Sequence, residues 1–499
     1  MTLTVQPSKH LLVVPVHMWG HTRPLCIAAA RMAKTCPSLA LTVCIASGMY
    51  DRAKTEMMRD FAPDEKEPLS RIRMVSIYEG RSMLDPEALV SNFLAVWNKL
   101  SSGESVSATS LDGAEHAINL RDAPLNAVLV DDTWPLAESI AEREGISFND
   151  AAYSVSVIVD RYRHENPSSS PFDVALGADL RSYEGPFGGV RLHASDVRLR
   201  VFTARTTVTM RKWLGETGRK IYYAGPLVAN GDAELKSGET ARREDDGAAN
   251  GRPAEHGQQG VLAFMDEQLK KRGERSVIYV SFGSMLWPLD PAKLVAALEV
   301  MMEQNIPLAL TRPSPFARLP EDFLKRLEEY GDAIIADWVP QQALLHHRAM
   351  GWCLTHGGHN TVLECLTAAV PMIVWPIVMD QPTNAVHLTD DLNVAYELLE
   401  VRHGHGLGRI YRTGYTPVGT VEAVRNEVRD VLTRAFGADG EAKRGRVAEL
   451  KDRLSDAWRK VGGGEKEEAG IGRREVEAFL EDVCARVPFT GGVVGVAAS

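Results

Sequence analysis

The sequence predicts an α/β protein built from two facing, doubly wound domains of Rossmann-like type. Its 499 residues are enough for two or three domains that each bury a core. Two blocks of the chain alternate short apolar runs of strand length with helical patterns, which is typical of parallel sheets covered by helices. Between the blocks lies a polar stretch, residues 230–259, that has almost nothing to bury.

The first block opens as a strand, a helix and a second strand. The run HLLVVPV, a glycine turn, the helical RPLCIAAARMAK and the run LALTVCIAS follow one another between residues 10 and 47. A further buried-strand run, LNAVLVDD, precedes the helical WPLAESIAEREGI, and residues 161–198 have mostly loop character. We therefore expect residues 1–229 to form a parallel α/β domain.

After an interdomain linker over residues 230–259, the alternation of strands and helices restarts. Strand-length runs recur as SVIYVSFGSM, PLALT, DAIIADW, GWCLTH and PMIVWP, with helical sequence between them. They predict a second domain over residues 260–460. Helical patterns over 421–458 and 473–483 flank the flexible run VGGGEKEEAGIG. We expect residues 461–499 to form a helix that crosses back to the first domain, followed by a flexible tail.

Composition argues against several classes of protein. A net charge of -10, with no basic arm, argues against binding of nucleic acid. The amino terminus lacks the charged start and long apolar core of a signal peptide, and no run reaches the roughly 20 apolar residues of a membrane helix. Cysteines are scattered, without a CxxC pair or a disulfide framework. We expect a cytoplasmic monomer without a membrane anchor.

The run THGGHNTVLECL places two histidines and two glycines in the turn between a strand and a helix. Because WCLTH ends a strand and TVLECLTAA has a helical pattern, the turn lies at a helix amino terminus. Free backbone N–H groups and the helix dipole there favour an anion such as a diphosphate. Glycines let the backbone approach the ligand, and His356, Asn360 and Thr361 can add hydrogen bonds.

Two other interpretations of this turn stay open when the turn is taken alone. A metal site needs further ligands, and no His, Cys, Asp or Glu cluster of recognisable metal spacing lies nearby in the sequence. A capping box is the stronger alternative, because Thr361 and Glu364 have its spacing and Glu364 would then merely reach back to the start of the helix.

Flanking motifs favour the ligand-binding interpretation. WVPQQALLHH precedes the turn and PIVMDQPTNA follows it, so W-V-P-Q, THGGHNT, E, P, DQ and NA occur in that order within residues 338–385. This pattern resembles the donor-binding signature of the glycosyltransferases that use UDP-sugars, known in plants as the secondary-product glycosyltransferase box. VIYVSFGSM, YYAGPL and VVPVHMWGHTRPL are also similar to that family, so the resemblance covers nearly the whole chain and implies the GT-B fold.

One position departs from the plant pattern. The residue before the asparagine of the turn is commonly tryptophan in plant members and is His359 here. The difference argues against a plant origin, and His359 receives no role.

The resemblance implies that residues 1–229 bind the acceptor and residues 260–460 bind the nucleotide sugar. It also implies a role for each of the other matched residues. Trp338 would stack on the uracil, Gln341 would hydrogen-bond the edge of the base, and Glu364 would bind the ribose hydroxyls. Asp380 and Gln381 would hydrogen-bond the sugar. The residues expected around the diphosphate are Ser284, His356, Gly358, Asn360 and Thr361.

A histidine after the first strand is the candidate catalytic base. VVPVHMWGHTRPL contains His17 and His21, and the resemblance selects His21 because the family's catalytic histidine follows the glycine. In the family an aspartate at the end of a later strand orients this histidine. LNAVLVDD supplies Asp131, which takes the family position, with Asp132 as the alternative. Helix capping is the structural alternative for these residues.

These assignments predict an inverting transfer of a sugar from a UDP-sugar to a hydroxyl of a small, partly apolar acceptor, such as a phenolic or a polyketide. His21 would take the hydroxyl proton and Asp131 would orient the imidazole. The helix amino terminus and His356 would stabilise the departing UDP, so neither a metal nor a cofactor is expected. UDP-glucose is the expected donor, because a glutamine at the position of Gln381 accompanies glucose in many relatives.

Other functions fit less well. A nicotinamide dehydrogenase needs G-x-G-x-x-G after the first strand, where HMWGHTRP stands instead. The glycine run at residues 404–408 lacks the strand-to-helix context and is expected to be a loop. A membrane-linked glucuronosyltransferase would carry a signal peptide and an anchor, and a sterol transferase would have a different phosphate turn. A non-catalytic nucleotide-sugar-binding subunit is the alternative, although it would have no reason to keep His21 and Asp131.

Overall fold

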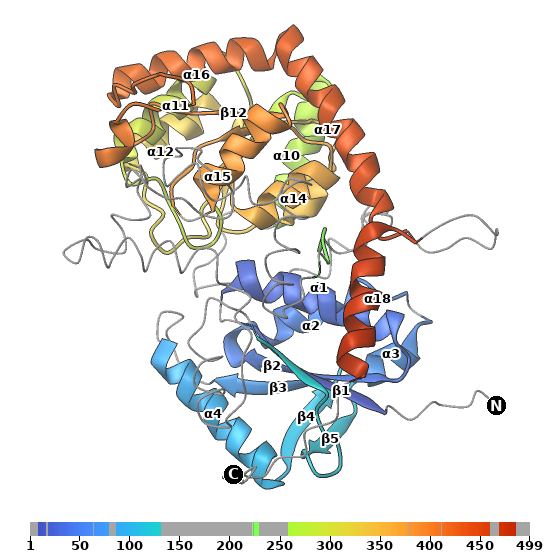
Figure 1. The fold of residues 1–499 in the computed structure, drawn as a ribbon. Helices are drawn as coiled ribbons and strands as arrows, with labels where there is room; N and C mark the ends of the chain where they lie inside the picture. Colours follow the sequence, from blue (N-terminus) through green and yellow to red (C-terminus); the bar gives the residue numbers. More distant parts are fainter. Residues whose placement is uncertain are drawn as a thin grey trace. The chain divides into compact units, whose positions relative to one another are not determined.

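Two compact units, each built on its own six-stranded sheet, make up the described part of the chain (Figure 1). The computed structural model describes residues 8–15, 18–62, 64–78, 86–130, 222, 224–228, 258–378, 380–410, 412–459 and 469–485. Within these ranges, the residues up to 130, those at 222 and 224–228, and those from 456 onward form the first unit. Residues 258–455 form the second unit.

The sheet of the first unit has the strand order β5-β4-β3-β2-β1-β6. β1, β2, β3 and β6 are parallel, as expected, and β4 and β5 add an antiparallel hairpin beside β3 that the sequence did not indicate. The elements are β1 (Lys9–Val14), α1 (Trp19–Thr35), β2 (Leu39–Ala46), α2 (Tyr50–Met58), α3 (Lys66–Ser70), β3 (Ile72–Tyr78), α4 (Pro86–Ser102), β4 (Val106–Ser110), β5 (Glu115–Ile118), β6 (Ala127–Val130) and α18 (Ile471–Cys484).

Alternate residues of each strand pack into different cores, one on each face of this sheet. Leu11 and Val13 of β1 join a core with α1, α2 and α18, whereas Leu12 and Val14 join the core under α4. The carboxyl-terminal helix α18 is thus an integral part of the first unit, and Lys9 Nζ also donates to the carbonyl of Cys484 at 2.6 Å.

The sheet of the second unit has the order β12-β11-β10-β7-β8-β9, and all its strand pairs are parallel. Its elements begin with α10 at Gln258, so the last two residues of the predicted linker belong to a helix. The elements are α10 (Gln258–Arg272), β7 (Val277–Ser281), α11 (Pro291–Glu303), β8 (Leu308–Thr311), α12 (Glu321–Tyr330), β9 (Ala333–Ala336), α13 (Gln341–Leu345), β10 (Met350–Thr355), α14 (His359–Thr367), β11 (Met372–Val374), α15 (Gln381–Val386), β12 (Ala395–Glu397), α16 (Val421–Ala435) and α17 (Ala438–Asp456).

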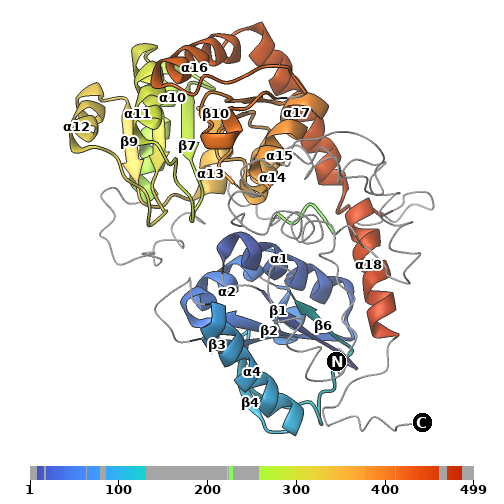
Figure 2. The ribbon, with the colours of Figure 1, turned by 60° about the vertical axis from the view of Figure 1, so that its left-hand side comes forward.

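Helices cover both faces of this second sheet, as a doubly wound fold requires. α11, α12 and α16 pack on one face around Ile278 and Val280, while α10, α13, α14 and α17 pack on the other around Val277 and Tyr279. α13, α14 and α15 lie beside one another at one end of the sheet (Figure 2). The residues predicted to bind the donor lie on or next to these three helices and the loop after β7.

Several expected features fall outside the described residues: most of the linker, the helix at 134–146, the loop at 161–198 and the terminal tail. Gly404–Leu407, expected as a loop, forms a short 3₁₀ turn. No helix in the described ranges is both long and apolar enough to cross a membrane.

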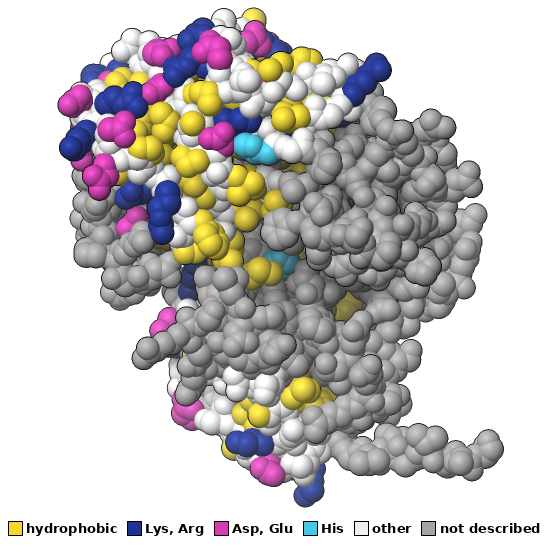
Figure 3. Space-filling view, turned by 90° about the vertical axis from the view of Figure 1, so that its left-hand side faces the viewer, with side chains coloured by type: hydrophobic (Ala, Val, Ile, Leu, Met, Phe, Trp, Pro, Cys, Tyr) yellow, Lys and Arg dark blue, Asp and Glu magenta, His cyan; other side chains and the backbone are white. Residues whose placement is uncertain are grey.

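On the face drawn in Figure 3, acidic and basic side chains of the second unit lie interspersed. Ion pairs join them across α11 and α16, as between Arg425 and Glu303 at 2.9 Å.

Candidate functional site

The second sheet changes winding direction between β7 and β10. The chain runs from β7 through β8 to β9 on one side, and then returns to place β10 on the other side of β7. The loops that follow β7 and β10 therefore diverge at the carboxyl edge of two neighbouring strands, which is where ligands bind in open α/β sheets. Gly283 and Ser284 follow β7, and the histidine-glycine turn follows β10.

The imidazole of His356 occupies this point, and two glycines make room for it. A Cβ atom at Gly283 would lie 2.8 Å from both Cε1 and Nε2 of His356, and one at Gly358 would lie 2.5 Å from Nε2. Gly283 also has a left-handed backbone, with φ of +74°. The ring is thus held between the two loops by backbone that carries no side chain.

His356 is neutral at physiological pH. Burial lowers its pKa to about 4, although the carboxylate of Asp380 acts in the opposite direction. Its Nδ1 lies 3.3 Å from the hydroxyl of Thr355. A neutral imidazole can donate a hydrogen bond to a ligand oxygen, and the dipole of α14 is a second source of electrostatic stabilisation at this point.

Helix α14 begins differently from the capping-box alternative. Gly358 is the N-cap and has no side chain to accept a hydrogen bond, and Thr361 lies inside the helix as its third residue. Glu364 consequently does not reach back as a capping residue and bonds to another element. The N-cap residue therefore supplies no side chain to the amino-terminal N–H groups of α14, and the N–H of His359 donates to the carboxylate of Asp380 instead.

Glu364 and Gln341, both predicted to bind the nucleoside, are hydrogen-bonded to each other. Gln341 Nε2 donates to Glu364 Oε2 at 2.6 Å, and Gln341 Oε1 accepts from the hydroxyl of Tyr279 at 2.8 Å. The same hydroxyl lies 3.3 Å from that of Thr311. Tyr279 and Glu364 are buried, and this chain of bonds joins β7 and β8 to α13 and α14. The amide and the carboxylate are held in one orientation before any ligand arrives.

The predicted sugar-binding pair lies at the start of α15. Asp380 Oδ2 accepts from the backbone N–H of His359, the first residue of α14, at 3.2 Å. Gln381 is buried, and its Oε1 accepts from the backbone N–H groups of Ile377 and Val378 at 3.0 and 2.9 Å. The structure therefore brings Asp380 next to the terminus where the diphosphate is expected.

The remaining predicted donor residues lie at the same carboxyl edge. Trp338 is half-buried in the loop after β9, Asn360 is in the first turn of α14, and Thr361 is buried in that helix. His359, which had no predicted role, has an exposed side chain. Within the described ranges, no group of three or more His, Cys, Asp and Glu residues could hold a metal ion.

The predicted catalytic residues belong to the first unit and are described only in part. His21 is half-buried in the first turn of α1, where its N–H donates to the carbonyl of Met18 at 2.9 Å. Asp131, its alternative Asp132 and His17 lie outside the described residues. Val130, which directly precedes Asp131 in the sequence, ends β6 and pairs with Val14 at the end of β1. The two strands that precede the candidate base and its partner are therefore neighbours, at the point where this sheet changes winding direction.

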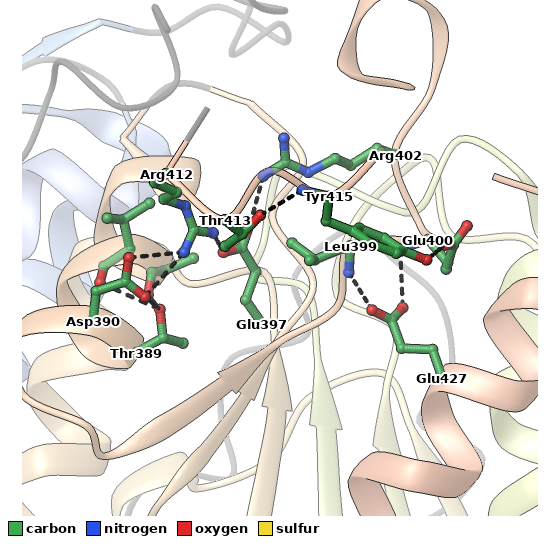
Figure 4. Close-up of polar contacts among 12 residues, drawn as sticks. Thr389, Asp390, Glu397, Leu399, Glu400, Arg402, Arg412, Thr413, Tyr415 and Glu427 are labelled. Atoms are coloured by element: carbon green, nitrogen blue, oxygen red, sulfur yellow. Dashed lines mark hydrogen bonds and ion pairs between the residues drawn. The ribbon is translucent and has the colours of Figure 1, made fainter. Parts of the chain in front are cut away.

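A separate ionic cluster lies beyond β12, at the same edge of the second sheet (Figure 4). Glu397 binds Arg402 at 2.7 Å and also Arg412. Arg412 in turn donates to both carboxylate oxygens of Asp390, at 3.0 and 2.9 Å. Since Glu397 and Arg412 are largely buried, this cluster anchors the loop after the edge strand.

Glu427 of α16 supports the same loop through its backbone. Its carboxylate accepts from the N–H groups of Leu399 and Glu400, at 2.6 and 2.9 Å, which continues the cluster in Figure 4. Burial nevertheless raises the pKa of Glu427 to about 7. Its contacts are with backbone, which is typical of a structural role.

Sequence reasoning missed two residues of this site. Tyr279 lies in the run SVIYVSFGSM, and strand alternation alone does not reveal that its hydroxyl reaches Gln341. Asn384 lies in PIVMDQPTNA and had no assigned role; it donates to Asp380 Oδ2 and to the carbonyl of Gly357, both at 2.7 Å. An asparagine four residues after Asp380 on a helix was the available signal.

Comparison with known proteins shows what parts of the chain are similar to. Residues 244–399 match the family described as UDP-glucoronosyl and UDP-glucosyl transferase. UDP-glycosyltransferase eriJ of the fungus Hericium erinaceus is 36% identical over 252 residues, which cover 50% of this chain and 47% of that protein. The chain thus spans about half the length of the curated relative that it matches.

Solved plant structures extend the similarity in fold to nearly the whole chain. Medicago truncatula UGT71G1, complexed with UDP-glucose, superposes with a TM-score of 0.60 at 17% identity, over 95% of this chain and 98% of that one. Phytolacca americana UGT2, complexed with UDP-2fluoro-glucose and pterostilbene, gives 0.57 at 17% identity, over 97% and 100%. Residues 244–399 therefore match the UDP-glucoronosyl and UDP-glucosyl transferase family, and the two α/β units have the GT-B fold of the plant structures.

Proposed function

We propose that this protein is an inverting glycosyltransferase, which moves a sugar from a UDP-sugar to a hydroxyl of a small, partly apolar acceptor. The observation that carries the proposal is the prearranged polar chain of Tyr279, Gln341 and Glu364 beside the His356 turn. A fixed amide suits the edge of a base, and a buried carboxylate suits vicinal hydroxyls of a ribose. The amino terminus of α14 lies beside them, and its helix dipole suits a diphosphate.

The donor and acceptor are inferred with help from the relatives. One related structure contains UDP-glucose, and another contains UDP-2fluoro-glucose with the phenolic pterostilbene. Together with Asp380 and Gln381 at the start of α15, these relatives support UDP-glucose as the donor and a phenolic or similar hydroxyl compound as the acceptor.

We assign the proton-accepting role to His21 and the orienting role to Asp131. His21 takes the proton of the acceptor hydroxyl as its oxygen attacks the anomeric carbon. Attack from the side opposite the departing UDP inverts the configuration at that carbon. The pairing of β1 with β6 supports this assignment, because each residue follows one of two adjacent strands.

A donor and acceptor screen tests the proposal. Purified protein is incubated with UDP-glucose, UDP-galactose, UDP-N-acetylglucosamine or UDP-glucuronate and a panel of phenols and aliphatic alcohols, and products are measured by mass spectrometry. We expect the highest kcat/KM with UDP-glucose, and His21→Ala should reduce transfer about 10²–10⁴-fold while retaining UDP binding. A phenol should be affected less than an alcohol, because it loses its proton more readily.

His116→Ala is the matched control, since His116 lies on β5, at the opposite end of the first sheet from β6. Unchanged transfer in His21→Ala would refute the catalytic assignment. A wild-type protein that binds UDP-glucose but transfers no sugar to any acceptor would instead support the non-catalytic binding subunit.

A further inference from the structure

Asn384 joins two parts of the candidate donor site that come from different elements. Its side chain, half-buried on α15, donates to the carbonyl of Gly357 in the turn after β10, at 2.7 Å. It also donates to Oδ2 of Asp380, at 2.7 Å. Both partners are acceptors only, so the amide nitrogen must face them and the orientation of the side chain is unambiguous.

These bonds determine how Asp380 points. Its Oδ2 accepts two hydrogen bonds, one from Asn384 Nδ2 and one from the backbone N–H of His359 at the start of α14. A carboxylate held through one oxygen by two donors has little freedom to rotate, so Oδ1 is presented as the acceptor for a ligand.

The side-chain amide of Gln381 is oriented so that a donor faces the ligand, whereas Asp380 offers an acceptor. Its Oε1 accepts from the N–H groups of Ile377 and Val378, at 3.0 and 2.9 Å. Because these donors are backbone groups, they require the carbonyl oxygen on that side and leave Nε2 as the atom that can donate to a ligand. Two consecutive residues therefore present one fixed acceptor and one fixed donor.

We propose that Asn384 is a positioning residue: it ties the sugar-binding pair to the diphosphate turn, so that the sugar is bound by Asp380 as acceptor and Gln381 as donor. This inference rests on the proposed function of the site. Asn384 itself needs no contact with the sugar. Its effect passes through Asp380 on one side and through the Gly357 carbonyl on the other.

A double-mutant cycle with Asn384→Ala and Asp380→Ala tests the coupling. The readouts are kcat/KM for transfer from UDP-glucose, and the affinities for UDP-glucose and for UDP measured by calorimetry. We expect Asn384→Ala to lower kcat/KM by about 10-fold or more, the usual effect of losing a hydrogen bond to a charged group. It should weaken binding of UDP-glucose more than binding of UDP. Its effect should be smaller once Asp380 has been removed, because only the bond to the Gly357 carbonyl is then left to lose.

Gln381→Glu tests the polarity without disturbing the turn. The glutamate can still accept from Ile377 and Val378, but it replaces the donor that faces the ligand by an acceptor. We expect a selective loss of affinity for UDP-glucose relative to UDP, measured at a temperature where the folded fraction of the variant equals that of the wild type. Asn426→Ala, at an exposed asparagine of α16 in the same unit, is the matched control and should behave as the wild type.

The results would distinguish failure of the positioning role from failure of the proposed function. Additive losses in the double mutant, or a lower melting temperature of Asn384→Ala with an unchanged ratio of UDP-glucose to UDP affinity, would overturn the positioning role. Tighter binding of UDP-glucose by Gln381→Glu would overturn the assigned polarity. A wild-type protein that binds no UDP would overturn the proposed function itself, and the positioning role with it.

Discussion

Substitution of Gly283 by alanine is expected both to strain the backbone and to displace the imidazole of His356. The new Cβ would lie 2.8 Å from Cε1 and Nε2 of the imidazole, closer than side-chain atoms tolerate. The imidazole has little room to move away, because its Nε2 also lies close to the backbone of Gly358. We therefore expect Gly283→Ala to move His356 away from the start of α14.

Gly331→Ala is the matched control for this substitution. Gly331 ends α12 in the same unit with φ of +73°, close to the +74° of Gly283, but a Cβ there would meet nothing within 4 Å. An alanine in the left-handed region costs about 1–2 kcal/mol, so both variants should lose that much unfolding free energy in urea titrations. Gly283→Ala should lose more, because the contact with His356 adds to the strain.

Calorimetric titration with UDP then distinguishes the two variants. If His356 donates a hydrogen bond to the diphosphate, its displacement should weaken UDP binding by about 10-fold or more, since hydrogen bonds to charged groups contribute about 1.5–3 kcal/mol. Gly331→Ala should bind UDP as the wild type does. Equal UDP affinities of folded Gly283→Ala and Gly331→Ala would refute the assignment of His356 to the diphosphate site.

Three further predictions concern the nucleoside contacts, metals and pH. Tyr279→Phe removes the donor to Gln341 and should weaken UDP binding about 2- to 10-fold in calorimetry, whereas Tyr330→Phe, which loses a bond to the carbonyl of Ile306, should not. Transfer should survive exhaustive chelation, and rescue of a chelator-inactivated enzyme by Mg²⁺ or Mn²⁺ would contradict the proposed role of the α14 terminus. Burial lowers the pKa of His10 to about 4, so its neutral form contributes stability above about pH 6.5 that is lost as the pH falls toward 4. His10→Gln should flatten this decline in urea titrations, and an equally steep decline in the variant would contradict it.

Five of the six strands of the second unit, β7 to β11, were predictable from the sequence, as were the helix after the histidine-glycine turn and the position of that turn, whereas β12 was not predicted. Their signals are local: β7, β8 and β10 are short apolar runs bounded by polar or turn residues, and both faces of these parallel strands are buried. The resemblance to UDP-sugar transferases rested on motifs such as THGGHNT and DQPTNA, which lie within one continuous stretch. A continuous motif needs no knowledge of distant contacts to be recognised.

The hairpin of β4 and β5 was not predictable in the same way. Its strands are short and mix buried with exposed residues, so their alternation is too weak to distinguish them from loops. The start of α14 was also ambiguous, because the spacing of Thr361 and Glu364 satisfies a capping box that the backbone does not form. Local spacing alone does not reveal which partner a side chain finds.

Those partners were decided only by the tertiary structure. Tyr279 and Gln341 are 62 residues apart, and they meet because the chain returns from β9 to place β10 beside β7. The same return brings the Gly283 turn against His356. The pairing of β10 with β11 places the segments that follow these strands side by side, and Asn384 thereby reaches the carbonyl of Gly357. The sequence by itself determined which chemical groups are available at the edge of the sheet, because strand and helix patterns are local. Only the winding of the sheet decided which of them are hydrogen-bonded, since contacts between distant segments depend on strand order.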